Sequence, residues 1–315
     1  MAKKIIVVFG ATGAQGGSVA RAILNDANSE FAVRAVTRDP NSDKAKALAS
    51  LGAEVVVGDI DDIESIKRAL AGAYGAYFVT FFWAHLSPEK EMAEAKNMAE
   101  AAKAAGLTHA IWSTLEDVRK SVPLSDDSMP TIRDKWKVPH FDGKGASDQY
   151  FVEAGVPVTY LLAPYFWENL INLNMGPKRG ADGKLALIFA MGTKKMAGIG
   201  TEDIGKCAYG IFKRGTEMVG KRIGVAGDQL TIAEMAAAMS KAIGEEVVYV
   251  EITPEKLRSY GFPGADDIAN MFQFYRDFDE LCNSTRDVNF SRELNPELQS
   301  FEMWLADNAK RIPIR

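Results

Sequence analysis

Three glycines near the start of the chain have the spacing of a loop that binds phosphate. Gly10, Gly13 and Gly16 recur at every third position, in the pattern G-x-x-G-x-x-G. Glycine permits tight turns and close approach of the backbone to a ligand, and free N–H groups at the start of a helix attract anions. We expect Gly10 to make the turn, Gly13 to let the backbone approach a diphosphate, and Gly16 to let the helix pack on the preceding strand. A turn without a ligand is the alternative.

A basic residue further along indicates which dinucleotide would fit. An apolar run over Phe31–Thr37 predicts a strand, and Arg38 and Asp39 follow it directly. In dinucleotide-binding folds, an acid here bonds the free 2′-hydroxyl of NAD, whereas an arginine accommodates the 2′-phosphate of NADP. Arg38 therefore favours NADP(H), because a guanidinium forms a charge-assisted pair with a phosphate. Asp39 leaves NAD open, and a solvated turn charge is a further alternative.

The elements that must position these residues alternate along the first half of the chain. The glycine motif stands between an apolar run at residues 5–9 and a helix expected over residues 18–27. Further strands are expected at 55–57, 77–80, 110–113 and Val158–Leu162, and further helices at 61–71, 88–106 and 143–154. Strands that alternate with helices predict an α/β protein with a doubly wound parallel sheet, the NAD(P)-binding Rossmann fold.

The pattern changes after Pro164, and we expect two domains. Residues 1–164 would form the Rossmann domain, and residues 165–315 a smaller mixed α/β lobe that packs on it and closes over the carboxyl ends of the sheet. In the lobe, Thr231 and Glu234 have capping-box spacing ahead of a helix that reaches Ile243. A helix over residues 266–278 carries a stripe of Met and aromatic residues, which we interpret as packing residues rather than a ligand site.

Composition excludes several functional classes. With 37 Lys and Arg against 42 Asp and Glu, the formal net charge is −5, which disfavours direct binding to nucleic acid or to anionic membranes. The longest apolar runs are far shorter than the ~20 residues that span a bilayer. Only two cysteines, Cys207 and Cys282, are present, so we expect neither a disulfide framework nor a metal site. These features predict a soluble cytoplasmic protein, also nuclear in a eukaryote.

Five short motifs together resemble the NmrA-like family of atypical short-chain dehydrogenase/reductases. They are the glycine motif at 10–19, VTRDP at 36–40, HFDGKG at 140–145, PYFWEN at 164–169 and GFPGA at 261–265. HFDGKG is the most specific, and the match extends over residues 4–305. The chain looks most like the animal members, which are described as NADPH sensors. Fungal members act as repressors that bind a transcription factor, and some bacterial members are quinone reductases.

The resemblance implies a cofactor site for NADP(H), residue by residue. The diphosphate would lie on the glycine motif, the 2′-phosphate on an arginine, the adenine beside two residues after the third strand, and the nicotinamide half beside later segments. In that order the residues are Gly10, Ala11, Thr12, Gly13, Ala14, Gln15, Gly16; Arg38; Asp59, Ile60; Thr80, Phe81, Phe82; Lys144; and Phe166, Trp167, Glu168, Asn169. At one position where the family has a lysine that contacts a cofactor phosphate, this chain has Ala93, so that phosphate contact is missing.

The resemblance also defines three candidate catalytic residues. Reductases of the wider superfamily use Tyr-x-x-x-Lys, in which the ammonium lowers the pKa of the phenol. Here His140 replaces the tyrosine and Lys144 is retained. Histidine titrates near neutrality, so His140 could donate a proton, whereas Lys144 could bind ribose hydroxyls without any chemistry. Ser113 ends a predicted strand where the superfamily has its catalytic serine.

Two functions of different class follow from these residues. The first is an NADP(H)-binding regulator that senses redox state and acts through a protein partner. The second is an NAD(P)H-dependent oxidoreductase of quinones or electrophilic carbonyls, whose pocket would be lined by aromatics near Phe81 and Phe166. Residues 115–139 form a long charged segment that we interpret as a lid ordered by the cofactor.

Overall fold

The structure is a computed structural model that describes residues 2–314, and contacts between residues divide the chain into two compact units. The first unit comprises Met1–Asp117, His140–Ala163 and Glu202–Ile223. The second comprises Val118–Pro139, Pro164–Thr201 and Gly224–Arg315. Each unit is thus built from three segments of the chain, with residues 118–139 in the second unit and residues 202–223 in the first.

The first unit is built on a seven-stranded sheet with the strand order β11-β6-β5-β4-β1-β2-β3. The pairs from β3 to β6 are parallel. The chain fills the sheet outward from β1 to β3, then returns and fills the other side from β4 to β6, so the switch point lies between β1 and β4. The strands are β1 (Lys4–Val8), β2 (Phe31–Thr37), β3 (Glu54–Val57), β4 (Gly75–Phe78), β5 (His109–Thr114), β6 (Val158–Leu162) and β11 (Arg222–Gly224).

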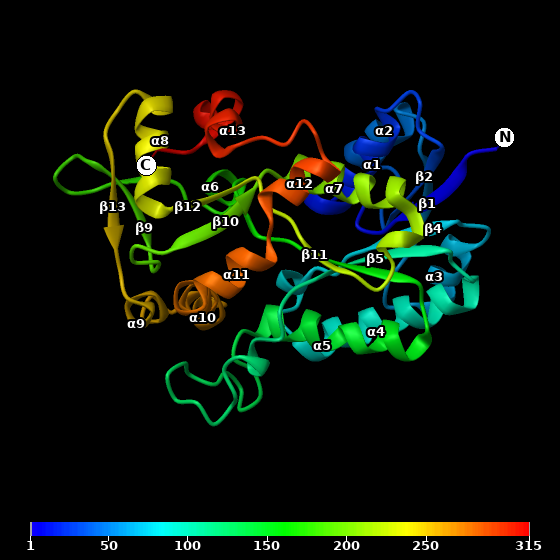
Figure 1. Ribbon diagram of the computed structural model, residues 1–315, viewed down its shortest axis with the longest axis horizontal. Helices are drawn as coiled ribbons and strands as arrows, with labels where there is room; N and C mark the ends of the chain where they lie inside the picture. Colours follow the sequence, from blue (N-terminus) through cyan, green and yellow to red (C-terminus); the bar gives the residue numbers. More distant parts are fainter. Residues whose placement is uncertain (1, 315) are drawn as a thin grey trace. The chain divides into compact units, whose positions relative to one another are not determined.

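Helices cover both faces of this sheet, with α3, α4 and α5 on one face and α1, α2 and α7 on the other (Figure 1). Three of them begin after a capping side chain: Ser42, Asp62 and Ser87 each accept a backbone N–H of the first turn. The helices are α1 (Ala14–Leu24), α2 (Asp43–Ser50), α3 (Ile63–Leu70), α4 (Pro88–Ala105), α5 (Pro139–Ala154) and α7 (Thr201–Arg214).

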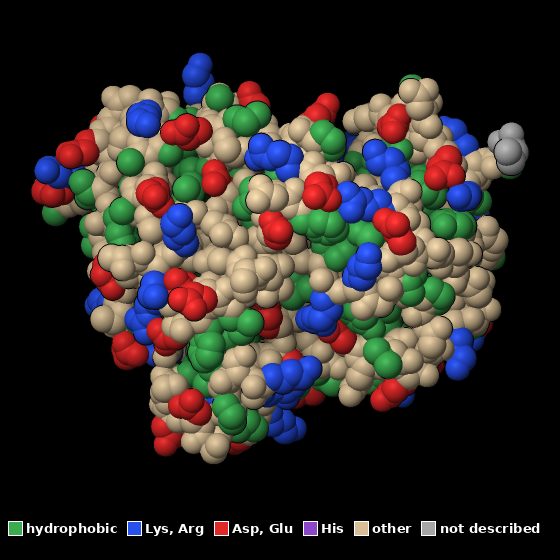
Figure 2. All heavy atoms as spheres, viewed as in Figure 1, with side chains coloured by type: hydrophobic (Ala, Val, Ile, Leu, Met, Phe, Trp, Pro, Cys, Tyr) green, Lys and Arg blue, Asp and Glu red, His purple; other side chains and the backbone are tan. Residues whose placement is uncertain are grey.

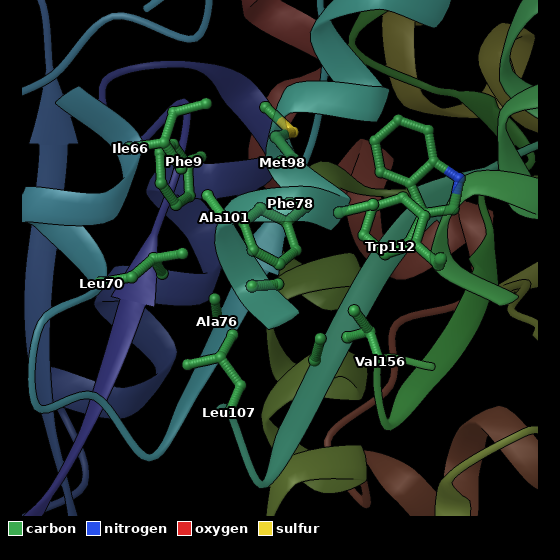
Figure 3. Close-up of a cluster of buried hydrophobic side chains, with 14 of the residues drawn as sticks. Phe9, Ile66, Leu70, Ala76, Phe78, Met98, Ala101, Leu107, Trp112 and Val156 are labelled. Atoms are coloured by element: carbon green, nitrogen blue, oxygen red, sulfur yellow. The ribbon is translucent and has the colours of Figure 1, made fainter. Parts of the chain in front are cut away.

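A buried apolar cluster holds α3 and α4 against the sheet (Figure 3). Phe9 and Phe78 stack with ring centroids 5.2 Å apart, and Trp112 stacks on Phe151 of α5 at the same separation. Met98 of α4 is fully buried in the same cluster. This packing fixes the carboxyl ends of β1, β4 and β5, where the candidate residues lie.

The second unit contains two three-stranded sheets, β12-β10-β7 and β13-β9-β8, with helices packed around them. Trp167 packs against Phe301 and Trp304. Phe272 of α10 packs on Tyr165 and Phe189, and Phe272, Phe274 and Tyr275 are buried, so the predicted aromatic stripe is core. Its strands are β7 (Tyr165–Phe166), β8 (Lys178–Arg179), β9 (Leu185–Phe189), β10 (Lys195–Ile199), β12 (Asp228–Thr231) and β13 (Val247–Glu251). Its helices are α6 (Asn169–Asn172), α8 (Ile232–Ile243), α9 (Pro254–Arg258), α10 (Ala265–Asp277), α11 (Asp279–Thr285), α12 (Val288–Leu294) and α13 (Phe301–Asn308).

Several element boundaries differ from the sequence predictions, and three of the differences move a candidate residue. Helix α1 begins at Ala14 rather than at residue 18, because Gly16 and Gly17 are buried and packing offsets their low helix propensity. Strand β4 ends at Phe78, so Thr80 lies in the turn that follows it. Helix α5 begins at Pro139 rather than at residue 143, so His140 and Lys144 lie on one helix.

Candidate functional site

The glycine motif forms a tight turn between β1 and α1. Gly10 has a left-handed backbone, with φ at +61°, and Gly13 donates its N–H to the Gly10 carbonyl at 2.8 Å. A Cβ on Gly16 would clash with the carbonyl oxygens of Phe9 and Gly10. Gly10 therefore makes the turn and Gly16 lets the helix approach the strand, as the sequence predicts.

The first turn of α1 presents free backbone N–H groups. Within the described chain, no side chain caps this helix and its first turn carries no acidic residue. The N-terminal N–H groups of a helix lack partners inside the helix and carry a partial positive charge. The beginning of α1 is consequently suited to a phosphate group.

Arg38 lies exposed at the end of β2, and no described residue accepts a hydrogen bond from its guanidinium. Asp39 is engaged in its own turn, where its Oδ1 accepts the N–H of Asn41 at 2.9 Å. Arg38 is thus available to an anionic ligand, while one of the two Asp39 carboxylate oxygens is already in use. This arrangement favours a 2′-phosphate over a 2′-hydroxyl.

Asp59 and Ile60 lie in the turn that follows β3. Asp59 is exposed, and its Oδ1 accepts the Asp61 N–H at 3.0 Å, which fixes the turn. Ile60 is half-buried against the core cluster, and its carbonyl accepts a hydrogen bond from the Asn97 side chain of α4 at 3.1 Å. These bonds hold the turn beside the edge of the sheet.

Lys144 is held in a buried polar network. Its Nζ lies 2.8 Å from Glu91 Oε1 and donates to Thr80 Oγ1 at 2.6 Å. The Thr80 hydroxyl in turn donates to Glu91 Oε1 at 2.7 Å. Glu91 is fully buried, and Thr80 and Lys144 are nearly so. The charge of the ammonium is therefore balanced by the Glu91 carboxylate, and the Thr80 carbonyl is a third partner at 3.3 Å.

His140 lies among aromatic rings at the start of α5. Its ring centroid is 4.9 Å from that of Trp83, 5.9 Å from Phe82 and 4.6 Å from Phe141. Phe82 is buried, whereas Phe81 is 66% exposed and Trp83 is 39% exposed. The turn after β4 thus presents two aromatic side chains to solvent.

Ser113 lies at the end of β5, and its hydroxyl donates to Gln15 Oε1 at 2.8 Å. The Tyr77 hydroxyl of β4 donates to the same oxygen at 2.8 Å. Ser113 and Tyr77 are both buried. A side chain of the glycine loop is therefore tied to the ends of two strands.

The residues expected beside the nicotinamide belong to the second unit. Trp167 is buried in its aromatic core. Glu168 accepts hydrogen bonds from the Thr201 N–H at 3.0 Å and from the Trp304 indole at 3.1 Å. Phe166 is half-buried in β7, and Asn169 is half-buried where α6 begins. Within this unit Trp167 and Glu168 have structural partners, and Tyr165 is likewise core rather than part of an exposed apolar pocket.

Sequence reasoning missed Glu91 and Tyr77. Glu91 is one of several acidic residues at the start of α4 and does not stand out by type. The buried stripe of α4 at Ala95, Met98 and Ala102 gives a signal, because its extension by one turn reaches Glu91. No comparable pattern distinguishes Tyr77 from the apolar residues of its strand.

Residues 2–305 match the family model of the NmrA-like family. The chain belongs to the NmrA-like family. This confirms the resemblance that the motifs indicate. An NmrA-like family domain-containing protein of Dictyostelium discoideum is 28% identical over 313 residues, which are 97% of either chain. An NmrA-like family domain-containing oxidoreductase of Cladobotryum sp. is 29% identical over 294 residues, 86% of this chain and 83% of that one.

Solved structures confirm the fold prediction. The structure of NmrA, a negative transcriptional regulator, in complex with NADP has a TM-score of 0.80 at 23% identity, over 98% of this chain and 95% of that chain. The same regulator in complex with NAD has a TM-score of 0.80 at 22% identity and the same coverage. The α/β Rossmann fold of this NmrA-like chain is therefore established.

Metal and membrane features are absent from the described part of this NmrA-like chain. Within residues 2–314, no group of three or more His, Cys, Asp or Glu side chains is placed to hold a metal ion. No described helix combines the length and the apolar character needed to cross a membrane.

Proposed function

We propose that this protein binds NADP(H) at the carboxyl edge of the first unit's sheet and acts as a redox-state sensor through a protein partner. Support for the cofactor comes from the uncapped start of α1 after Gly13 and from the free guanidinium of Arg38. The NmrA structures in complex with NADP and NAD support the same class of ligand. The Arg38 side chain favours NADP(H) over NAD(H), because its guanidinium would pair with the 2′-phosphate.

The observation that carries the regulatory function is the state of Lys144. In a hydride-transferring reductase, an uncompensated ammonium assists proton transfer by lowering the pKa of its neighbour. Here Glu91 pairs with that ammonium in a buried site, and Thr80 binds it as well. With Glu91 Oε1, Thr80 Oγ1 and the Thr80 carbonyl as its three partners, the ammonium is poorly suited to activate a proton donor.

The partner we propose is a protein rather than nucleic acid. On the face drawn in Figure 2, acidic and basic side chains are intermixed, and neither sign forms a broad patch. Binding to the phosphate backbone of nucleic acid needs a basic surface. A net charge of −5 points the same way.

An NADPH-dependent oxidoreductase of quinones or electrophilic carbonyls is the second candidate. The Cladobotryum relative is named an oxidoreductase. Phe81 and Trp83, in the turn after β4, give the carboxyl end of the sheet an exposed apolar surface on which a planar substrate could stack. Such electrophiles accept hydride with little help from an acid.

The experiment that separates these functions is an NADPH oxidation assay after binding has been established by titration. A panel of quinones and activated carbonyls is offered to the wild type, to Lys144→Ala and to Lys96→Ala. Lys96 is an exposed lysine of α4 and serves as the matched control. The sensor predicts saturable binding without oxidation of NADPH. Oxidation that disappears in Lys144→Ala and persists in Lys96→Ala would make the protein a reductase.

A further inference from the structure

Gln15 connects the glycine loop to the two strands beside β1. It lies in the first turn of α1, immediately after the residues that would face a phosphate. Its Oε1 accepts the Tyr77 hydroxyl of β4 and the Ser113 hydroxyl of β5, both at 2.8 Å. The carboxamide therefore extends from the loop toward the ends of β4 and β5, the side of β1 opposite Arg38.

The two hydroxyls of this cluster are engaged with the carboxamide. Both donate to Gln15 Oε1, so the Ser113 hydroxyl serves to hold Gln15 in place. Burial raises the pKa of the Tyr77 phenol well above its usual range, which keeps the phenol protonated. The Gln15 Nε2 group carries two N–H donors, and no described residue accepts from it. Gln15 is only half-buried, so these donors are accessible.

The position of the carboxamide indicates which part of a dinucleotide it would meet. In doubly wound folds the dinucleotide lies across the switch point, with its adenosine toward the end of β2. Arg38 marks that end here. The nicotinamide half then lies over β4 and β5, where the Gln15 carboxamide is held by hydroxyls of the same two strands.

We propose that Gln15 donates its Nε2 hydrogens to an acceptor oxygen in the nicotinamide half of the dinucleotide, and that Tyr77 and Ser113 are positioning residues that hold it there. This inference rests on the proposed function, because it requires a dinucleotide at the glycine loop. It moves Gln15 from the residues expected at the diphosphate to the nicotinamide half, and Ser113 from the candidate catalytic residues to the support of the binding loop. No chemical step is needed for that role.

The sharpest test is Gln15→Glu, because a carboxylate still accepts both hydroxyls but offers no N–H. A second variant, Gln15→Met, removes the donors without adding charge. Each is titrated with NADPH and with adenosine 2′,5′-bisphosphate, which lacks the nicotinamide half. We expect both variants to bind NADPH about tenfold more weakly, the loss of a hydrogen bond to a charged or polar oxygen, and to bind the bisphosphate almost as the wild type does.

Positioning is tested by a double-mutant cycle. Ser113→Ala and Tyr77→Phe should each weaken NADPH binding by a smaller factor than Gln15→Met does. Ser113→Thr, which keeps the hydroxyl, should bind NADPH as the wild type does. Ser113→Ala in the Gln15→Met background should have no further effect, since the group that it positions is gone. Ser50→Ala, an exposed serine of α2, is the control for loss of a hydroxyl elsewhere. Thermal unfolding confirms that each variant folds.

Several outcomes would overturn the inference. Equal weakening of NADPH and of the bisphosphate would place Gln15 outside the nicotinamide half. Independent, multiplicative losses in the double variant would show that Ser113 does not act through Gln15. Turnover that is abolished in Ser113→Ala, with NADPH affinity unchanged, would make Ser113 catalytic. Failure of the wild type to bind NADPH would instead refute the proposed function, so the two failures are distinguishable.

Discussion

Lys144 and Glu91 form the ion pair on which the proposed function rests. A charge buried without its partner destabilises a protein strongly, whereas replacing both members by apolar residues costs far less. The pair joins α5 to the start of α4, with Glu91 fully buried and Lys144 nearly so. Its removal should therefore be measurable in the stability of the first unit as well as in ligand binding.

We predict that Glu91→Leu lowers the free energy of unfolding by about 3 kcal/mol, because it leaves the Lys144 ammonium buried and unpaired. The double variant Glu91→Leu with Lys144→Met should be more stable than the single variant. Urea denaturation measures both. Glu100→Leu, an exposed acid of the same helix, is the control and should change stability little. A double variant that is less stable than Glu91→Leu would contradict the ion-pair account.

Arg38 is the residue that we expect to bind the 2′-phosphate of NADPH. Arg38→Ala should weaken NADPH binding by roughly 1.5–3 kcal/mol, the range for a hydrogen bond to a charged group, and leave NADH almost unaffected. Lys44→Ala, a change of an exposed lysine just beyond the same turn, should have a smaller effect. Isothermal titration with the two cofactors checks this. Equal losses for both cofactors would mean that Arg38 does not contact the 2′-phosphate.

Elements with local signals were predictable from the sequence. Helix α8 runs from Ile232 to Ile243 behind the capping box of Thr231 and Glu234, and α4 ends at the left-handed Gly106. Caps, turns and apolar periodicity are set by neighbouring residues, so the chain displays them directly. Strands β7 to β10 and helices α11 to α13 were missed, because short elements of a mixed lobe form through packing with distant segments.

The candidate site was predictable only in its backbone. The glycine loop and the tip of β2 follow from sequence spacing; the structure places the loop after β1, beside the switch point, and Arg38 at the end of the neighbouring strand β2. The partners of the polar groups were not predictable. Glu91 and Lys144, or Gln15 and Ser113, come from separate elements, and nothing in either local sequence indicates the other. These contacts decide what the groups can do chemically.

The segment over residues 118–139 packs within the second unit rather than lying free. Lys137 is fully buried, and its ammonium donates to the carbonyls of Asp126 and Met129 at 2.7 Å. Asn270 of α10 donates to the carbonyls of Pro130 and Lys137. A cofactor-ordered lid remains a prediction, and its opening would have to break these bonds.

We predict that Asn270→Ala makes this segment more sensitive to trypsin at the exposed Arg133 and Lys135, because the bonds from α10 are lost. Limited proteolysis with mapping of the fragments measures the change. Asn308→Ala, at the end of α13, is the control. If Asn270→Ala leaves the cutting rate in this segment unchanged, the segment is not held by α10. A rate that falls on addition of NADPH would support the lid.

At the scale of the whole molecule, His109 should make stability depend on pH. Burial lowers the pKa of His109 from 6.5 to about 4. Its Nε2 lies 2.8 Å from the Thr159 hydroxyl, which itself donates to the Met218 carbonyl, so the neutral ring donates through Nε2. Between these two pKa values the unfolded chain binds a proton that the folded chain does not. The free energy of unfolding should therefore fall as the pH drops from 6.5 to about 4.

The expected size of this loss is about 3 kcal/mol, from the difference between the two pKa values. His109→Gln, which keeps a donor for Thr159, should unfold with a smaller pH dependence over that interval. Urea denaturation of the wild type and the variant in parallel isolates the contribution, because all other groups are common to both. Parallel curves would show that His109 does not carry the effect.

The central claim is that the protein binds NADP(H) without consuming it. The most direct measurement is a titration of the wild type with NADPH, in which bound cofactor and the absorbance of reduced nicotinamide are followed together in the presence of the quinone panel. Our account predicts saturable binding and a constant absorbance. Absence of binding would contradict the cofactor assignment, and steady loss of the absorbance would show that the protein is a reductase rather than a sensor.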